Sequence, residues 1–126
     1  LNIEMLATHL NDKVFRNFES TFKVLQWHSY EVQNLESVND VFLLASSEST
    51  KYQIFRYKDY AYGVQFHTEI KEDTISSWGK ITELKKVLEN NLGKNALYSF
   101  EKEGNKNIKN MKLNTEKLYE NFKKIL

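Results

Sequence analysis

The strongest constraint on the fold is the order of two hydrophobic patterns, strand-like in the first half of the chain and helical in the second. Four short apolar or aromatic runs in the first half are typical of β-strands, and polar segments bound them. They are "FKVLQW" (22–27), "VFLLASS" (41–47), "YQIFRYK" (52–58) and "YAYGVQF" (60–66). The last two runs flank a turn-like Lys58-Asp59 pair, and this arrangement predicts an antiparallel hairpin.

A helical pattern follows from about residue 73. Asp73 or Thr74 is suited to begin a helix, apolar residues then recur at helical spacing, and Gly93 is suited to end it. The polar segment 101–107 predicts a break, and a last helix is predicted from about Ile108. Its apolar stripe, which fits either packing on its own domain or binding of a partner, comprises Met111, Leu118, Tyr119, Phe122, Ile125 and Leu126. Strands followed by helices indicate an α/β or α+β fold.

The composition argues against several classes of protein. The 126 residues suffice for one domain, and a net charge of +1, from 18 basic and 17 acidic residues, gives no electrostatic reason to bind nucleic acid or an anionic membrane. No apolar run approaches the roughly 20 residues that span a bilayer, and the start of the chain lacks a secretory signal pattern. The absence of cysteine excludes disulfides and thiolate metal sites within the chain. We therefore expect a soluble, cytoplasmic protein without a cofactor.

The stretch "YAYGVQFHTEI" (60–70) carries the chemistry that the sequence suggests. On an extended chain His67 and Glu69 point to the same side, because side chains alternate with period 2. A carboxylate beside a histidine fixes its tautomer, and such a histidine acts as a base toward the nucleophile of a catalytic triad. The spacing alone favours a structural, hydrogen-bonded histidine at a strand end over a catalytic one. A metal site is disfavoured, because no two histidines have helical i, i+4 spacing and no Pro-Cys-x-x-Cys motif follows.

The order of these features resembles the C-terminal half of class I, triad-type glutamine amidotransferase domains, especially the GMP-synthase-like branch. The matching features are "WHSYEV" (27–32), "LLASSES" (43–49), an aromatic hairpin and "YGVQFHTEI" (62–70), within roughly residues 14–79. The resemblance implies the C-terminal portion of a flavodoxin-like α/β fold, with a mixed sheet that includes an antiparallel hairpin. We accordingly expect residues 1–93 to belong to the amidotransferase domain and residues 94–126 to form a helical tail packing on it.

The same resemblance implies roles for five residues. In that family a cysteine attacks the side-chain amide of glutamine, ammonia leaves, and water then releases glutamate from the thioester. His67 would be the general base and acid for that cysteine, and Glu69 would orient His67. The loop that contains His28, Ser29 and Tyr30 would contact the amino-acid end of the substrate.

Two departures from the family pattern bear on this hypothesis. Thr68 replaces the usual proline, which would fix φ and remove one donor, so we expect a looser loop. The chain has no cysteine, so we expect the nucleophile on a missing N-terminal half and predict that this chain alone is inactive. The expected partners are glutamine as substrate, that missing half, and a synthetase domain or subunit that accepts the ammonia. The sequence does not indicate which acceptor is used.

Two other hypotheses remain open at this stage. The chain could be a non-catalytic binding or regulatory module that kept the amidotransferase fold and lost the chemistry. It could also be an unrelated α+β interaction domain whose last helix docks a partner.

Overall fold

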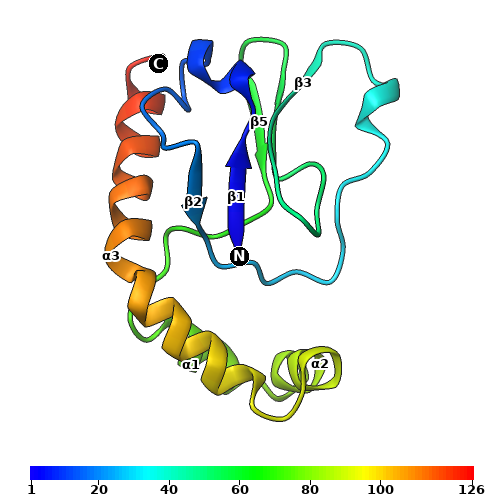
Figure 1. Cartoon of the computed structure of the whole chain (residues 1–126), viewed down its shortest axis with the longest axis vertical. Helices are drawn as coiled ribbons and strands as arrows, with labels where there is room; N and C mark the ends of the chain where they lie inside the picture. Colours follow the sequence, from blue (N-terminus) through cyan, green and yellow to red (C-terminus); the bar gives the residue numbers. More distant parts are fainter.

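The computed structural model describes all 126 residues, apart from the side chains of residues 7 and 8. Five strands form one sheet in the order β2-β1-β3-β4-β5, and each neighbouring pair is antiparallel. The strands are β1 (Asn2–Met5), β2 (Thr21–Lys23), β3 (Val41–Ser46), β4 (Ile54–Tyr57) and β5 (Ala61–Val64). Together with the helices, this sheet confirms the predicted α/β class (Figure 1). Between the described strands of this chain there is no parallel pairing of the kind that a mixed sheet contains.

The strand predictions were correct for the hairpin and incomplete at the start of the chain. β4 and β5 pair as predicted, and Lys58 in their turn has the left-handed φ of 50°. The run 22–27 was predicted as one strand, but β2 ends at Lys23 and Leu25 instead forms an isolated bridge with His67. β1 was not predicted, because four residues with alternating burial are too short for a recognisable period.

The main core lies on one face of the sheet, under the segment that links β1 to β2. The 3-10 helix η1 (Ala7–Asn11) begins this segment, and a second one, η2 (Leu35–Ser37), precedes β3. Edge-on aromatic contacts join Phe18 to Phe22 and Phe22 to Phe66 across the core. The buried residues of this core are Ile3, Met5, Val14, Phe15, Phe18, Phe22, Val24, Leu44, Ala45, Ile54 and Phe66.

Three α-helices complete the chain: α1 (Thr74–Gly79), α2 (Thr82–Leu92) and α3 (Ala96–Lys123). The continuous helix predicted from residue 73 is two helices, because Ile81 has an extended backbone (φ −80°, ψ 108°) that interrupts it. Gly93 ends α2 as predicted, with a φ of 97° that favours glycine.

The predicted break at 101–107 and the predicted helix start near Ile108 were wrong, since α3 continues through this whole segment. Gly104, read as part of a break, is buried against Ile75 of α1. A Cβ at this position would overlap the Ile75 Cδ1 atom, so the glycine allows the two helices to approach closely. The polar residues around it are mostly exposed, as the outer face of a packed helix requires.

α3 packs on two different parts of the molecule. Its first half meets α1 and α2 beyond one end of the sheet, and its second half runs along the sheet toward η1 (Figure 1). Of the predicted apolar stripe, Met111 is buried and Leu118 and Ile125 pack against the core, whereas Tyr119, Phe122 and Leu126 are exposed. The buried Asn121 Nδ2 donates hydrogen bonds of 2.9 Å to the carbonyls of Val14 and Arg16.

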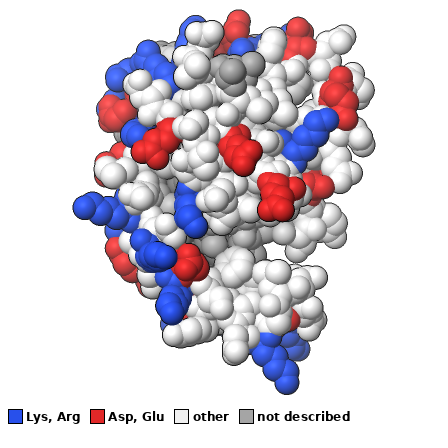
Figure 2. Space-filling model, viewed as in Figure 1, with Lys and Arg blue, Asp and Glu red and all other residues white. Residues whose placement is uncertain are grey.

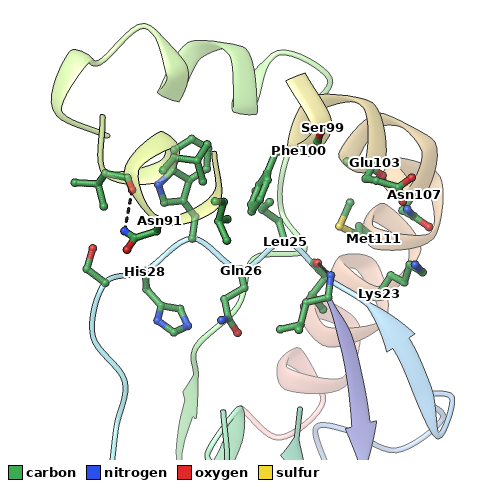
Figure 3. Close-up of a pocket in the computed structure, with 18 residues that line it drawn as sticks. Lys23, Leu25, Gln26, His28, Asn91, Ser99, Phe100, Glu103, Asn107 and Met111 are labelled. Carbon is green, nitrogen blue, oxygen red and sulfur yellow. Dashed lines mark hydrogen bonds between the residues drawn. The ribbon is translucent and has the colours of Figure 1, made fainter. Parts of the chain in front are cut away.

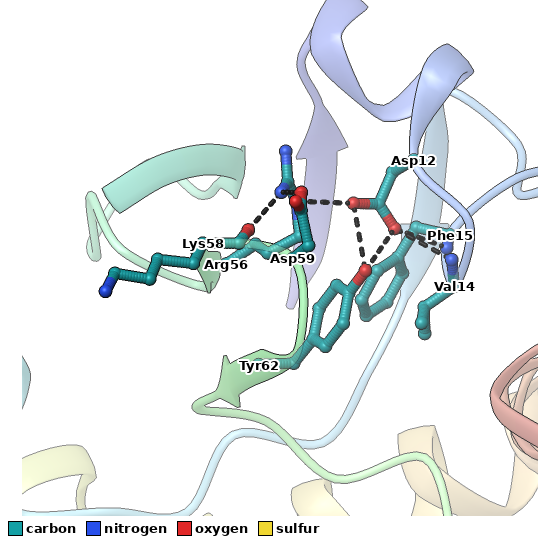
Figure 4. Close-up of polar contacts among 7 residues, drawn as sticks. All are labelled: Asp12, Val14, Phe15, Arg56, Lys58, Asp59 and Tyr62. Carbon is teal, nitrogen blue, oxygen red and sulfur yellow. Dashed lines mark hydrogen bonds and ion pairs between the residues drawn. The ribbon is translucent and has the colours of Figure 1, made fainter. Parts of the chain in front are cut away.

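A buried polar cluster joins the segment after η1 to the β4–β5 hairpin (Figure 4). Asp12 Oδ1 accepts hydrogen bonds from the backbone N–H groups of Val14 (2.8 Å) and Phe15 (3.1 Å). The Tyr62 hydroxyl lies 3.3 Å from both Asp12 oxygens. Arg56 Nε lies 3.1 Å from Asp12 Oδ2, an ion pair whose N–H is not directed at the oxygen as a hydrogen bond requires. The cluster therefore ties two distant segments of the chain together.

The exposed surface carries both signs of charge. Figure 2 shows Lys and Arg side chains interspersed with Asp and Glu over one face, without a large region of a single sign. Among the described residues, no helix is both long and apolar enough to cross a membrane.

Candidate active site

His67 is placed by the strand that precedes it and by a partner segment that lies far away in the sequence. β5 ends at Val64, the chain bends at Phe66, and His67 then pairs with Leu25. The His67 N–H donates to the Leu25 carbonyl (2.8 Å), and the Leu25 N–H donates to the His67 carbonyl (3.0 Å). The backbone on both sides of the imidazole is therefore fixed, although the side chain itself is 35% exposed.

His67 and Glu69 interact directly. His67 Nδ1 lies 2.6 Å from Glu69 Oε1, and the backbone N–H of Thr68 donates to Glu69 Oε2 (3.0 Å). Both carboxylate oxygens thus have a partner on the same short loop. Within the part of the chain whose side chains are described, no group bonds His67 Nε2.

The pKa of Glu69 determines which tautomer this arrangement favours. Burial raises the pKa of Glu69, but the hydrogen bonds from His67 and from the backbone, with the charge of His67, outweigh it and lower the pKa below its usual value. The carboxylate is therefore ionised near neutral pH and can only accept. His67 Nδ1 must then carry the donated proton, and Nε2 is the nitrogen left to act as a base.

Thr68, which was expected to loosen this loop, makes two hydrogen bonds there. Its N–H donates to Glu69, a bond that proline could not make. The Thr115 hydroxyl of α3 also donates to Thr68 Oγ1 (2.9 Å), and Thr68 is buried. The replacement of the family's proline is thus accompanied by two hydrogen bonds that hold the loop in place.

Aromatic side chains cover one side of the imidazole. The ring of Trp78 on α1 lies edge-on to His67, with centroids 5.3 Å apart and planes at 73°. Trp27 contacts Trp78 in the same way (5.4 Å, 84°), and Phe100 of α3 contacts Trp27 (5.9 Å, 71°). Residues from four distant segments thus form one aromatic row that ends at His67.

Gln65 joins the loop after Trp27 to the strand that leads to His67. Its Oε1 accepts a hydrogen bond from the Val32 N–H (2.9 Å), and its Nε2 donates to the Tyr52 carbonyl (2.7 Å). One side chain therefore bridges the loop, the residues before β4 and the His67 strand. The sequence analysis did not single out Gln65, because both of its partners lie far away in the sequence.

The three residues predicted to hold substrate differ in their positions. Ser29 and Tyr30 are exposed, and the Tyr30 side chain is 90% exposed. His28 is half-buried, and its Nε2 is buried without a hydrogen-bond partner. Figure 3 shows Gln26 and His28 pointing the same way, and Gln26 Oε1 accepts a hydrogen bond of 2.5 Å from the buried Gln53. The start of this loop is thus anchored, while Tyr30 projects into solvent.

A cavity of about 820 Å³ lies between residues 23–29, α2 and α3 (Figure 3). His28 and Ser29 line it, whereas Tyr30, His67 and Glu69 do not. Sequence reasoning missed most of its walls, because they come together only in the folded chain. These walls include Leu25, Leu88, Asn91, Phe100, Glu103, Asn107 and Met111. Its volume falls in the range of small-molecule sites, and Trp27 forms part of its wall next to Trp78.

Among the residues whose side chains are described, no three His, Asp or Glu groups are placed to share a metal ion. His67 and Glu69 form a hydrogen-bonded imidazole–carboxylate pair, which can transfer protons at Nε2.

Comparisons with known proteins show the family of this chain. Residues 2–77 match the family model described as glutamine amidotransferase class-I. Because the match spans more than half of the chain, the chain belongs to the class I glutamine amidotransferase family. A search of curated protein sequences found no match.

A solved structure supports the same fold. The chain is similar to the crystal structure of a glutamine amidotransferase from Thermotoga maritima, with a TM-score of 0.67 and 25% sequence identity. The match covers 96% of this chain and 48% of the Thermotoga chain. This chain therefore spans about half the length of that protein.

Proposed function

We propose that this chain supplies the histidine and the carboxylate of a Cys-His-Glu glutaminase site, and that the cysteine lies on polypeptide outside these 126 residues. The observation that carries the proposal is the 2.6 Å contact between His67 Nδ1 and Glu69 Oε1, in a chain that belongs to the class I amidotransferase family. The ionised Glu69 favours the tautomer that leaves Nε2 unprotonated and ready to accept a proton from a thiol.

The proposed reaction transfers protons through one nitrogen. His67 Nε2 takes the proton of the thiol, and the thiolate attacks the carbonyl carbon of the glutamine side-chain amide. The C–N bond breaks, and His67 returns the proton to the leaving nitrogen, which departs as ammonia. Water, deprotonated by the same Nε2, then attacks the thioester, and glutamate and the thiol are released. Glu69 stabilises the imidazolium that forms in both steps through its contact with Nδ1.

We propose that glutamine binds along the loop that contains His28, Ser29 and Tyr30. Support comes from the Gln65 bridge, which holds Val32 of this loop against the strand that carries His67. The exposure of Ser29 and Tyr30 leaves their polar groups available to a ligand.

The ammonia acceptor is proposed to be a synthetase domain or subunit, in a cytoplasmic protein. The resemblance to the GMP-synthase-like branch is the reason to test purine-nucleotide synthesis first. The missing half that carries the cysteine and such a synthetase are the two protein partners of the proposal.

The proposal is tested by glutamate release from the intact protein that contains this chain. We expect His67→Ala to lower kcat about 100-fold or more, because it removes the proton carrier. Glu69→Ala should lower it about tenfold, because the imidazole remains but loses its orienting partner. Glu72→Ala is the matched control, since Glu72 is a nearby exposed carboxylate that pairs with Lys112 instead. Normal turnover by His67→Ala would refute the proposal.

A second candidate is a non-catalytic, amidotransferase-like binding or regulatory module. The observation behind it is that none of the 126 residues is a cysteine. The intact mass of the purified protein, thiol labelling and glutamate release on one sample separate the two candidates. A mass above 15.0 kDa, or a second polypeptide, together with a labelled thiol and glutamate release favours the enzyme. A mass of 15.0 kDa without thiol or activity favours the module.

A further inference from the structure

His67 needs more than Glu69 to hold its ring in one orientation. Rotation of the imidazole about χ1 and χ2 is restrained at Nδ1 by one hydrogen bond, and only as far as the Glu69 carboxylate itself is held. Burial does not prevent this rotation, because the side chains of His67 and Glu69 are 35% and 60% exposed. A base, however, must aim its reactive nitrogen at the proton that it takes. Another contact must therefore fix the plane of the ring.

We propose that Trp78 is a positioning residue that fixes the plane of the His67 imidazole and so the direction of Nε2. The indole and the imidazole meet edge-on, with centroids 5.3 Å apart and planes at 73°, which is a favourable geometry for two aromatic rings. Rotation of the imidazole about χ1 or χ2 would break this contact. The hydrogen bond sets the tautomer, and the indole sets the plane.

Trp78 is itself held from two directions. On α1, Ile75 lies one turn earlier and is buried against Gly104 of α3. From the other side, Trp27 packs edge-on against Trp78, and Phe100 of α3 packs against Trp27. The row of aromatic rings thus relates the orientation of His67 to the position of α3. For turnover, this inference rests on the proposed function, in which His67 is the base.

The alternative is that Trp78 only fills the smaller hydrophobic core. It does pack there, with Leu25, Ile70, Ile75 and Met111. A purely structural role predicts lower stability for a Trp78 variant and no change in the χ1 and χ2 angles of His67 in the folded protein. The decisive readout is therefore the His67 ring itself.

The test is NMR of the histidine ring protons in the purified protein that contains this chain, in which His67 is one of three histidines within these 126 residues. The His67 signals are identified with His67→Gln. The χ1 and χ2 angles of His67 are then measured from three-bond couplings and from NOEs of its ring protons to neighbouring backbone protons, because loss of the indole changes the ring-current shift whether or not the imidazole moves. In Trp78→Leu we expect these angles to average over several rotamers, and in Trp78→Phe to stay close to those of the wild type. Phe42→Leu is the matched control, because it removes a partly exposed aromatic ring outside the row. Unchanged His67 angles in folded Trp78→Leu would overturn the inference, whatever the activity.

Kinetics in the glutamate-release assay form the second readout. We expect Trp78→Leu to lower kcat about tenfold with little change in KM, and Trp78→Phe to stay within about threefold of the wild type, because small misplacements of a reacting group reduce the rate steeply. Unchanged kcat in Trp78→Leu, where His67→Ala is inactive, would overturn the inference. Changed His67 angles in Trp78→Leu together with normal turnover by His67→Ala would instead refute the proposed function and leave the positioning of the ring supported. If Trp78→Leu does not fold, Trp78→Met takes its place, and unchanged His67 angles there also overturn the inference.

Discussion

The molecule contains two carboxylates that each hold an aromatic or heteroaromatic ring, and they are built differently. The Asp12 side chain is 1% exposed and is surrounded by two backbone N–H groups, the Tyr62 hydroxyl and Arg56. The Glu69 side chain is 60% exposed and has two partners, His67 and the N–H of Thr68. All partners of Asp12 belong to the chain itself, whereas the Glu69 pair leaves one imidazole nitrogen without a bond among the described residues.

The difference shows why the polar cluster with the larger pKa shift is not the one assigned to chemistry. The pKa of Tyr62 is raised to about 12, first by burial and then by the Asp12 carboxylate. That shift results from contacts among residues of the chain itself, which join two segments of the fold. Perturbed pKa values are found in structural networks as well as in active sites. A titratable nitrogen or oxygen that lacks a hydrogen-bond partner is therefore the more useful indication of an active site.

The largest expected effect is the loss of stability when the Asp12 carboxylate is removed. Asp12→Ala should lower the free energy of unfolding by about 3 kcal/mol or more, because it leaves two backbone donors without their partner and removes the buried one of the two carboxylates that pair with Arg56. Urea denaturation measures this loss. Asp59→Ala is the matched control, since Asp59 also pairs with Arg56 but is 91% exposed, and it should cost less than about 1 kcal/mol. Equal losses in the two variants would show that the Asp12 cluster does not hold the fold.

An intermediate effect is expected at Gln65, which connects the loop after Trp27 to the His67 strand. Gln65→Leu should cost about 1–2 kcal/mol, because the Val32 N–H and the Tyr52 carbonyl both lose their partner. Hydrogen exchange at the Val32 amide should quicken. Gln33→Leu removes only an exposed bond to Glu31 and should leave the exchange of that amide unchanged. Unchanged protection of Val32 in Gln65→Leu would mean that the loop is held in another way.

The sequence predicted those parts of this picture that depend on neighbouring residues. The β4–β5 hairpin and the end of α2 at Gly93 follow from local turn and capping preferences, and both are observed. The closeness of His67 and Glu69 follows from the two-residue spacing. The predicted break around Gly104 was wrong, because the reason for that glycine is a contact with Ile75, about thirty positions earlier in the chain.

The remaining features depend on residues that only the fold brings together. Asp12 meets Tyr62 across fifty positions, and Trp78 reaches His67 from a separate helix. No periodicity or motif marks such pairs in one sequence. The contact of Thr68 with Thr115 was not predicted for the same reason, since Thr115 lies on α3.

A smaller, pH-dependent effect is expected at Tyr62. The raised pKa means that the folded state keeps the hydroxyl proton between pH 10.0 and about 12, where the unfolded state loses it. Its contribution to stability is therefore complete below pH 10.0 and is lost as the pH rises toward 12. Tyr62→Phe should cost about 1 kcal/mol near neutral pH and should flatten the alkaline loss of stability. Tyr60→Phe, at an exposed tyrosine, should keep the wild-type pH dependence, and an identical slope in both variants would contradict the prediction.

The smallest effect on stability is expected at the pair assigned to chemistry. The lowered pKa of Glu69 stabilises the fold above the pKa of an unfolded glutamate, and this contribution is lost as the pH falls through the folded-state value. Because the side chain is 60% exposed, solvent screens the interaction, and Glu69→Gln should cost less than about 0.5 kcal/mol at neutral pH. The acid loss of stability, measured by urea denaturation over the acidic range, should be slightly shallower in the variant.

The same substitution should have a much larger effect on turnover than on stability, because an amide at position 69 no longer dictates which imidazole nitrogen carries the proton. Asp12→Ala should show the reverse, with a larger effect on stability than on the turnover of the protein that remains folded. If Glu69→Gln destabilised the protein as strongly as Asp12→Ala, the pair would belong to the structural frame. The comparison between Asp12, whose partners all lie within the chain, and Glu69, whose imidazole partner keeps one nitrogen that no described residue bonds, would then no longer identify the site.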